Sequence, residues 1–245
     1  MISNTVILLT ACVNPDGMTK TILQDTKIRQ GQYENALSFY LSRTPYKIVV
    51  VENTCCNFSE RFNSYILSER LEFITFDGNN YDKSLGKGYG EMLIIKHALS
   101  NSKLIKDSDY IIKITGRLIV SNINILLSSI KFIWNKKQPF IAGDISLNNT
   151  YAISQFLIAS KSFYTDILIT KLKELDDARL IYFENVLANA ILEWKKRGNK
   201  FYVFSIPIVF KGISGTDGKK IPKPTLFYRV RIILKSFYLN CIKSY

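Results

Sequence analysis

The densest chemical pattern in the sequence is a basic, glycine-rich segment, residues 83–91, which leads directly into a helical pattern. Glycines let a backbone approach a phosphate closely, the first turn of a helix presents free N–H groups, and lysines add positive charge. Lys83 and Lys87 are therefore candidate phosphate ligands, with a solvated loop as the alternative. No Ser or Thr follows Lys87, and the glycine spacing is wrong for a dinucleotide fingerprint, so two named phosphate motifs are excluded.

A second candidate anion site lies where the apolar run 110–114 gives way to Thr115-Gly116-Arg117. A guanidinium forms two parallel hydrogen bonds with a phosphate group, so Arg117 could hold a diphosphate. Lys113, inside the apolar run, is a further candidate cation for the same group. The alternative for Arg117 is an ion pair with an acidic side chain at the surface.

Two carboxylates are candidates for general base catalysis, in which a side chain takes the proton from an attacking hydroxyl. Glu184 stands in Phe183-Glu184-Asn185, at the start of a helical pattern and after an aromatic pair. A glutamate at this position also stabilises the helix dipole, which is the structural alternative. Asp144 is the second candidate, either as a base or as a ligand of a sugar.

Cysteine and histidine content excludes other chemistry. Four cysteines lack the paired spacing of a zinc site, and His97 stands alone among apolar helix positions, so neither a zinc site nor a histidine-based triad is expected. The sequence therefore favours a reduced, cytoplasmic protein. The apolar run 6–13 has no basic residues before it and is short for a membrane span, so we interpret it as the first strand.

Alternating strand and helix patterns position these residues. Strand patterns cover 5–13, 46–51, 71–76 and 110–114, and helical patterns cover 27–41, 60–67, 90–98 and 123–134. This order predicts an α/β fold with a mostly parallel sheet flanked by helices. The second half is less regular, with short extended segments at 140–142, 151–159 and 201–206 and helical patterns at 163–175 and 183–196.

Ligands of open α/β sheets lie beyond the carboxyl ends of the strands. The polar residues at the ends of the first two predicted strands are Thr10, Cys12, Asn14, Glu52 and Asn53. Residues 77–80 and 115–117 follow the third and fourth strands. We expect these four segments to surround one site.

Residues 4–210 resemble glycosyltransferases of the GT-A fold, particularly the small enzymes encoded in bacterial surface-polysaccharide clusters (O-antigen, capsule and lipooligosaccharide). The resemblance rests on the order of elements, on the strand-end residues, and on Phe183-Glu184-Asn185, which looks like the family's acidic motif. It implies a nucleotide-sugar donor and Glu184 as the base of an inverting, hexosyltransferase-type reaction. The acceptor would be a hydroxyl of a glycan or a lipid-linked molecule. The nucleoside would contact Thr10, Cys12, Asn14, Glu52 and Asn53.

The sequence departs from the family at the fourth strand, where Asp-x-Asp normally holds a divalent metal and Thr115-Gly116-Arg117 stands here. Asp107-Ser108-Asp109 precedes the strand, so we interpret it as a helix-to-strand turn at the opposite edge of the sheet. We expect a metal-independent enzyme without a cofactor. Positive groups would then neutralise the departing diphosphate, and the candidates are Lys83, Lys87, Lys113 and Arg117. Arg29, on the helix after the first strand, is a weaker candidate and is expected instead on a solvated helix face.

Positive charge is concentrated late in the chain. Residues 195–245 hold 12 Lys and Arg against one acid, so residues 1–194 account for only +2 of the net +13. Residues 226–245 have a helical pattern, with Arg229, Ser236 and Asn240 on one side and Phe227, Leu234, Tyr238 and Cys241 on the other. We therefore expect a catalytic domain over 1–222 and a basic amphipathic helix over 223–245. This helix would contact an anionic membrane surface at the inner face of the cell membrane, or instead pack on the domain.

Three other functions compete with glycosyl transfer. A basic pI near 9.5 and 14 tyrosines are compatible with nucleic-acid binding, but the near-neutral first 194 residues argue against it. A sugar nucleotidyltransferase would be expected to carry a glycine-rich loop ending in Arg after the first strand, and residues 10–14 lack it. A noncatalytic scaffold is the third alternative, because the missing Asp-x-Asp could mark a lost activity.

Overall fold

The centre of the molecule is strand β1 (Thr5–Ala11), in which every residue is buried. Continuous aliphatic runs of this kind form strands that are covered on both faces. β2 (Lys47–Glu52) and β4 (Tyr110–Thr115) lie on either side of β1 and are buried over almost their whole length. The structure is a computed structural model that describes residues 4–134, 138–215 and 217–242.

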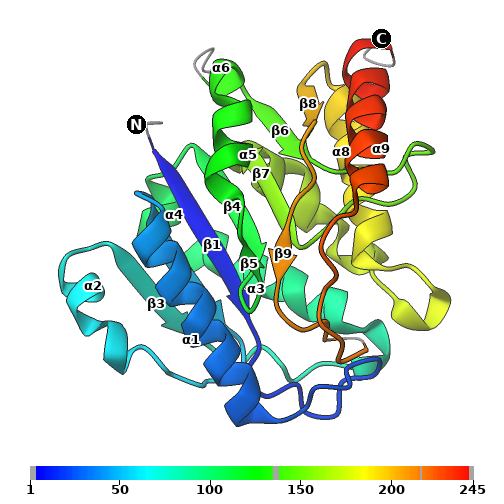
Figure 1. The fold of residues 1–245 in the computed structure, drawn as a ribbon. Helices are drawn as coiled ribbons and strands as arrows, with labels where there is room; N and C mark the ends of the chain where they lie inside the picture. Colours follow the sequence, from blue (N-terminus) through cyan, green and yellow to red (C-terminus); the bar gives the residue numbers. More distant parts are fainter. Residues whose placement is uncertain (1–3, 135–137, 216, 243–245) are drawn as a thin grey trace.

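The described residues form a seven-stranded sheet with the strand order β3-β2-β1-β4-β7-β6-β8 (Figure 1). The remaining strands are β6 (Phe140–Gly143) and β7 (Phe156–Ser160), which are internal, and β3 (Leu71–Thr75) and β8 (Lys200–Val203), which form the two edges. β1 to β4 are mutually parallel, as are β6 and β8, and only β7 runs antiparallel to its neighbours. The predicted mostly parallel sheet is therefore confirmed.

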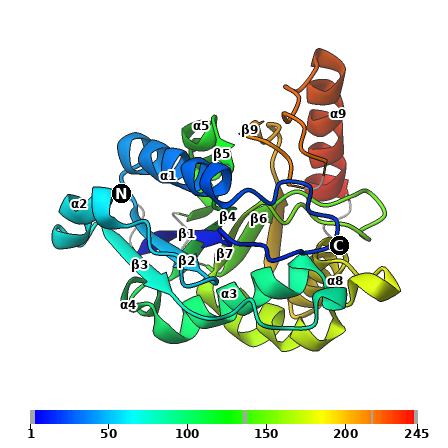
Figure 2. The ribbon, with the colours of Figure 1, turned by 90° about the horizontal axis from the view of Figure 1, so that it is seen from below.

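Helices cover both faces of the sheet. The helices are α1 (Thr26–Arg43), α2 (Asn63–Leu67), α3 (Lys87–Asn101), α4 (Lys103–Lys106), α5 (Ile123–Ser129), α6 (Lys131–Trp134), α7 (Lys161–Phe163), α8 (Phe183–Lys196) and α9 (Leu226–Phe237). In Figure 2, α1 and α5 lie on one side of the sheet, and α3, α4 and α8 lie on the other. Each layer buries one of two hydrophobic clusters against the sheet.

Shorter helical turns and one small ribbon complete the described chain. The turns are η1 (Glu60–Phe62), η2 (Lys83–Leu85), η3 (Tyr164–Leu168), η4 (Ile169–Glu174), η5 (Asp177–Arg179) and η6 (Tyr238–Ile242). β5 (Ile119–Val120) pairs with β9 (Phe210–Lys211) in a separate two-stranded ribbon. This pairing places the segment after β9 beside the end of β4.

Two predicted helices are interrupted. The pattern over 123–134 divides into α5 and α6, and that over 163–175 divides into α7, η3 and η4. Hydroxyl side chains lie near each break: Ser129 donates to the carbonyl of Leu126, and Thr170 donates to the carbonyl of Ile167. Such bonds compete with the regular helical ladder, which accounts for the local change of geometry.

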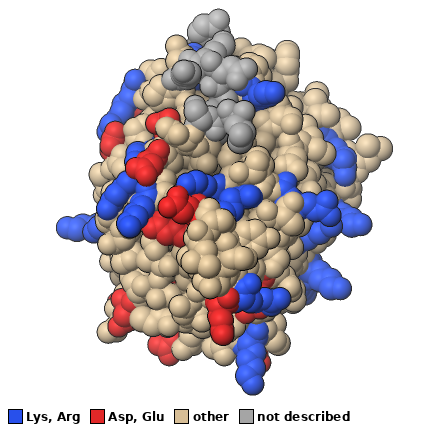
Figure 3. All heavy atoms as spheres, turned by 90° about the vertical axis from the view of Figure 1, so that its left-hand side faces the viewer, with Lys and Arg blue, Asp and Glu red and all other residues tan. Residues whose placement is uncertain are grey.

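Charges of both signs are mixed on the face formed on the α1 and α2 side (Figure 3). An example is the pair between Arg61 and Glu34, whose closest nitrogen and oxygen are 2.6 Å apart. In the part of the chain that the structure describes, no helix is long and apolar enough to cross a membrane.

Candidate active site

A cavity of about 680 Å³ opens beyond the carboxyl ends of β1 and β4. Its volume lies in the usual range of small-molecule sites. The strand register explains its position, because Thr10 of β1 pairs with both Val51 and Thr115, so neighbouring parallel strands end together. The loops that follow these strands form the walls, as expected for an open α/β sheet.

The cavity contains about half of the site residues that the sequence predicted. Those that line it are Thr10, Cys12, Asn53, Lys87, Arg117 and Glu184. The lining, as described, does not include Asn14, Glu52, Lys83, Lys113 and Asp144. Most members of the second group make contacts inside the protein that explain their positions.

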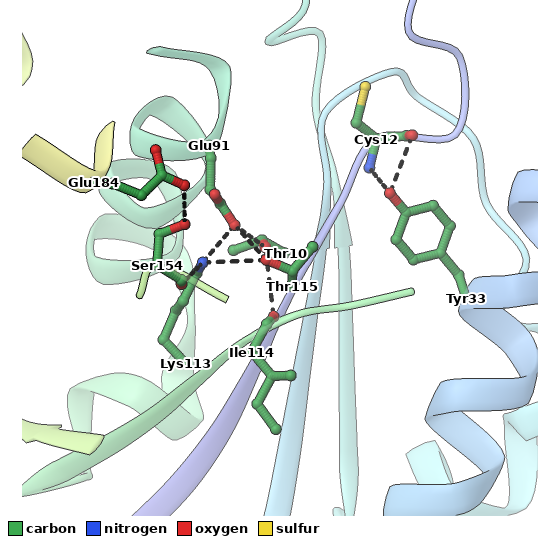
Figure 4. Close-up of polar contacts among 9 residues, drawn as sticks. All are labelled: Thr10, Cys12, Tyr33, Glu91, Lys113, Ile114, Thr115, Ser154 and Glu184. Carbon is green, nitrogen blue, oxygen red and sulfur yellow. Dashed lines mark hydrogen bonds and ion pairs between the residues drawn. The ribbon is translucent and has the colours of Figure 1, made fainter. Parts of the chain in front are cut away.

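Glu91 and Lys113 form an ion pair at the floor of the cavity (Figure 4). The Lys113 ammonium is 2.5 Å from Glu91 Oε1 and donates to the carbonyl of Ser154 at 2.7 Å. The same Glu91 oxygen accepts hydrogen bonds from the hydroxyls of Thr10 at 2.8 Å and Thr115 at 3.1 Å. Only 2% of Lys113 is exposed, so the lysine predicted to bind diphosphate serves first as a partner of Glu91.

The Glu91 carboxylate is kept ionised by this network. Burial alone raises its pKa, but the nearby Lys113 charge and the hydrogen bonds from Lys113, Thr10 and Thr115 bring the pKa below its ordinary value. Glu91 lines the cavity, yet the sequence analysis did not select it as a site residue. Glu91 lies at the end of the basic, glycine-rich segment, in which the lysines were the predicted ligands.

Glu52 holds two loops together. It is fully buried, and its carboxylate accepts hydrogen bonds from the backbone N–H groups of Val13, Thr54 and Cys56, at 2.8 to 2.9 Å. These bonds join the loop after β1 to the loop after β2. Asn14 lies in the first of these loops and is exposed, while its carbonyl accepts from the side chain of Asn79.

Two buried asparagines line the cavity beside these loops. Asn53 is 1% exposed and Asn79 is 8% exposed, and both amide oxygens are without a hydrogen-bond partner among the described residues. The Asn79 side-chain nitrogen donates to the carbonyl of Asn14, which fixes the orientation of that amide. Buried polar atoms are rarely left unpaired, but each of these oxygens has less than 1 Å² of accessible surface, so a ligand N–H or O–H reaches them only after a local shift of the loops. The sequence analysis placed Asn79 at a strand end but did not select it.

The glycines of the basic segment serve close packing. A Cβ at Gly86, where φ is +85°, would lie 2.0 Å from the carboxyl carbon of Asp177, and one at Gly88 would lie 2.7 Å from Cβ of Phe183. These glycines therefore let the start of α3 approach other side chains of the protein. Lys83 donates to the carbonyl of Asn79, and its ammonium lies 4.8 Å from the centre of the Tyr81 ring.

Four basic residues line the cavity, namely Lys20, Arg29, Lys87 and Arg117. Arg117 donates to the carbonyl of Ile213, and burial lowers its pKa, although a guanidinium stays charged at neutral pH. Lys87, the first residue of α3, also has a lowered pKa, mainly because the surrounding protein desolvates it. Lys20 comes from the loop after β1 and donates to the Tyr182 hydroxyl at 3.2 Å. Its position in a long, irregular loop gave no sequence motif, so it was missed.

Two carboxylates besides Glu91 line the cavity. Glu184, in the first turn of α8, is half-buried and accepts a hydrogen bond from the Ser154 hydroxyl at 2.8 Å (Figure 4). Asp177, in η5, is 8% exposed, and burial raises its pKa against the opposing charges of Lys20 and Lys87. The sequence analysis did not select Asp177, because the neighbouring acid Asp176 and the irregular turn obscure which carboxylate faces the site.

Asp144 is held at a different place. Its carboxylate pairs with the ammonium of Lys235 on α9, and both side chains are largely buried. The structure therefore does not bring Asp144 together with Glu184 at the cavity. Glu184 is the better placed of the two predicted bases.

The expectation that Arg29 lies on a solvated helix face was wrong. It is 5% exposed, and its guanidinium donates to the carbonyls of Cys12, at 2.6 Å, and Leu23, at 3.2 Å. These carbonyls belong to the loop that connects β1 to α1, and Arg29 fixes this loop from inside. Burial also raises the pKa of the Cys12 thiol to about 11. The thiol, which lines the cavity, is therefore protonated and uncharged at physiological pH.

No protein-family model matches the chain, and no curated protein matches it by sequence. Solved structures are similar in fold. The mannosyltransferase Ktr4p from S. cerevisiae is 10% identical, with a TM-score of 0.51, and the match covers 97% of this chain and 81% of that chain. Core-mannan synthase A from Aspergillus fumigatus, in its Mn/GDP form, is 10% identical with a TM-score of 0.48, over 97% of this chain and 85% of that chain.

A cytidylyltransferase from Leptospira borgpetersenii is also similar, with 15% identity and a TM-score of 0.39, over 82% of this chain and 75% of that chain. At these identities the likeness concerns the fold alone. The seven-stranded, mostly parallel sheet flanked by helices is a GT-A-like fold, which the mannosyltransferase Ktr4p shares, as the sequence predicted.

Proposed function

We propose that the protein is a glycosyltransferase that moves a hexosyl group from a nucleotide-diphosphate sugar to a hydroxyl of a glycan or lipid-linked acceptor. One observation carries this proposal: a single cavity at the strand ends is lined by two asparagines with unpaired amide oxygens, four basic residues and a half-buried glutamate. A nucleotide sugar needs these three kinds of partner, for its nucleoside, its diphosphate and the group transfer itself.

The nucleoside is assigned to the part of the cavity lined by Cys12, Asn53 and Asn79. After a local shift of the loops that uncovers them, the unpaired oxygens of the two asparagines would accept hydrogen bonds from N–H groups of the base or from ribose hydroxyls. Glu52 and Asn14 support this part indirectly, because their contacts fix the two loops that carry the asparagines.

The diphosphate is assigned to Arg117, Lys87 and Lys20. Charged donors aimed at a departing diphosphate stabilise the negative charge that develops on it. We propose that these cations act without a divalent metal, because Thr115-Gly116-Arg117 ends β4 and the Glu91 carboxylate is already engaged by Lys113.

Glu184 is assigned as the general base of an inverting transfer. Its carboxylate takes the proton of the acceptor hydroxyl while the hydroxyl oxygen forms a bond to the anomeric carbon. The bond between that carbon and the diphosphate oxygen breaks, and the negative charge passes to the leaving group beside Arg117. The Ser154 hydroxyl, 2.8 Å away, holds the carboxylate in place.

The biological setting is the remaining part of the proposal. Synthesis of a bacterial surface polysaccharide, on the cytoplasmic side of the cell membrane, is the setting in which the family resembled by the sequence works. A hydroxyl acceptor on a growing glycan or on a lipid-linked sugar fits this setting. No nucleic acid is expected as a partner, because residues 1–194 carry a net charge of only +2, which is too little for a broadly basic surface.

Calorimetric titration tests the proposal directly. The purified protein is titrated with a panel of nucleoside diphosphates and nucleotide sugars in EDTA, and then with added manganese or magnesium. We expect binding in EDTA, which would also name the base of the donor. Binding only with metal contradicts metal independence, and no binding in either condition contradicts the transferase and favours a noncatalytic or nucleic-acid-binding protein. A nucleotidyltransferase would instead release pyrophosphate from a nucleoside triphosphate and a sugar phosphate.

A further inference from the structure

Helix α9 packs on the rest of the protein through its polar side. Lys235 pairs with Asp144, Ser236 is 3% exposed, and the Asn240 side chain both accepts from and donates to the backbone of Val203, at 2.9 and 2.8 Å. Ile232 is the one buried apolar residue within α9, and Leu239 follows in η6. A helix on a water-soluble protein normally buries its apolar face, and α9 does the opposite.

The apolar side of α9 faces solvent. Six large hydrophobic residues make up this outer face, with exposures from 48% to 80%: Leu226, Phe227, Val230, Ile233, Leu234 and Phe237. At 3.6 residues per turn they form one continuous arc, opposite to the arc of Ile232 and Ser236. In Figure 1, α9 stands at the edge of the molecule, with its outer side away from the sheet.

Positive charge borders this arc. On the helical wheel, Arg229 lies along one margin of the outer face and Arg231 along the other, and both are exposed. The region from residue 195 onward has 12 basic residues and one acid, unlike the mixed charges of the face in Figure 3. An apolar arc with arginines at its margins is the pattern of a helix that lies in the interface of a membrane.

We propose that the outer face of α9 binds an anionic bilayer, with its apolar residues below the headgroups and Arg229 and Arg231 among the phosphates. The charges favour this partner over a second copy of the chain, because two copies joined through this face would bring their arginines together. Lys235 does not take part, since Asp144 already neutralises it.

The segment before α9 connects this face to the cavity. Ile213 accepts a hydrogen bond from Arg117, Gly215 accepts one from the backbone of Ile22, and Ile221 lines the cavity. Ile221 precedes Leu226 by five residues, so the cavity wall lies at most about 18 Å from the outer face. On the basis of the proposed function, bilayer binding would place the transfer site within reach of an acceptor whose lipid stays in the membrane.

Vesicle flotation tests the binding. The full chain is mixed with vesicles of phosphatidylcholine alone, or of equal parts phosphatidylcholine and phosphatidylglycerol. We expect it to float with the anionic vesicles and to be released by high salt. The variant Phe227→Ser/Leu234→Ser should lower the partition coefficient at least tenfold, and Arg229→Gln/Arg231→Gln should lower it on anionic vesicles only. Leu67→Ser/Phe132→Ser is the matched control. These residues are 78% and 61% exposed but lie away from α9, so the partition coefficient should stay unchanged.

Three results would overturn the proposal: no flotation of the wild-type chain, an equal loss in the control variant, or flotation that the outer-face substitutions leave unchanged. Sedimentation velocity without vesicles provides the second readout. A wild-type dimer that Phe227→Ser/Leu234→Ser converts to a monomer, with no flotation, would make the outer face a self-association surface. Donor binding by the same variants is measured separately, so failure of vesicle binding and failure of the proposed enzyme are distinguishable.

Discussion

The ammonium of Lys113 and the carboxylate of Glu91 meet 2.5 Å apart at the floor of the cavity, where the Lys113 side chain is 2% exposed and that of Glu91 is 19% exposed. Removing one member leaves the other charged and unpaired in a poorly solvated place. Glu91→Gln should therefore lower the free energy of unfolding by about 3 to 5 kcal/mol, as measured by urea denaturation. The double variant Glu91→Leu/Lys113→Met should lower the free energy of unfolding by clearly less than Glu91→Gln does. Equal losses in the single and double variants would mean that the charges do not depend on each other.

The same pair predicts a pH dependence. The pKa of Glu91 in the folded protein lies below its ordinary value of 4.5, so the folded state favours the ionised form. This contribution to stability is complete above pH 4.5 and is lost as the pH falls through the lower pKa of the folded state. Denaturation at a series of pH values should show that the free energy of unfolding falls more steeply below pH 4.5 for the wild-type chain than for Glu91→Leu/Lys113→Met. Parallel curves would contradict the assignment.

Glu184→Gln should separate chemistry from binding. A general base contributes on the order of 10² to 10⁴ in rate, so turnover of the donor that calorimetry identifies should fall by that factor. Donor affinity should stay within about twofold, because Glu184 contacts the acceptor side. Glu193→Gln, a change at a partly exposed ion pair on the same helix, is the control and should leave turnover unchanged. If Glu184→Gln keeps most of its turnover, Asp177 becomes the next candidate for the base.

Arg117→Ala should weaken donor binding, because it removes a charged pair of hydrogen bonds to the diphosphate. The expected loss is about 10- to 100-fold in affinity, measured by titration in EDTA. Arg117→Lys should restore only part of it, since an ammonium cannot form the two parallel bonds of a guanidinium. Arg197→Ala, at a half-exposed surface pair, provides the comparison. An unchanged affinity in Arg117→Ala would exclude this arginine from the diphosphate site.

Gly215→Ala tests the position of the Arg117 side chain without changing its charge. A Cβ at residue 215 would lie 2.7 Å from a terminal nitrogen of Arg117, so the guanidinium must move. Donor affinity should fall while thermal unfolding stays close to that of the wild-type chain. Gly31→Ala is the matched control: a Cβ there meets nothing within 4 Å, and replacing a glycine inside α1 should stabilise the protein by about 1 kcal/mol.

The sequence predicted the sheet because its central strands are continuous aliphatic runs separated by periodic helices. β1, β2, β3 and β4 all lie where these runs indicated. Helices were predicted less well where hydroxyl side chains compete for backbone carbonyls, as Ser129 and Thr170 do. The ribbon of β5 and β9 was not predicted, since two residues per strand leave no measurable period.

The candidate site was predicted only where it follows a strand or opens a helix. Arg117 and Glu184 occupy such positions, and both line the cavity. Lys20 and Asp177 lie in irregular segments far apart in sequence, and only the folded chain brings them together. Lys113 and Glu52 have suitable chemical groups near the right strand ends. Their roles depend on their partners, which include Glu91 and the backbone of Val13. A linear sequence pattern does not reveal these partners.

The strand order has a consequence for synthesis on the ribosome. β3, β2, β1 and β4 are consecutive neighbours in the sheet and are complete when residue 115 has emerged, so four of the seven described strands can assemble early. Until β7 is made, the outer side of β4 is an open strand edge, and such edges invite pairing with other chains. The nascent protein therefore passes through one interval, between residues 116 and 155, in which chaperone protection matters most.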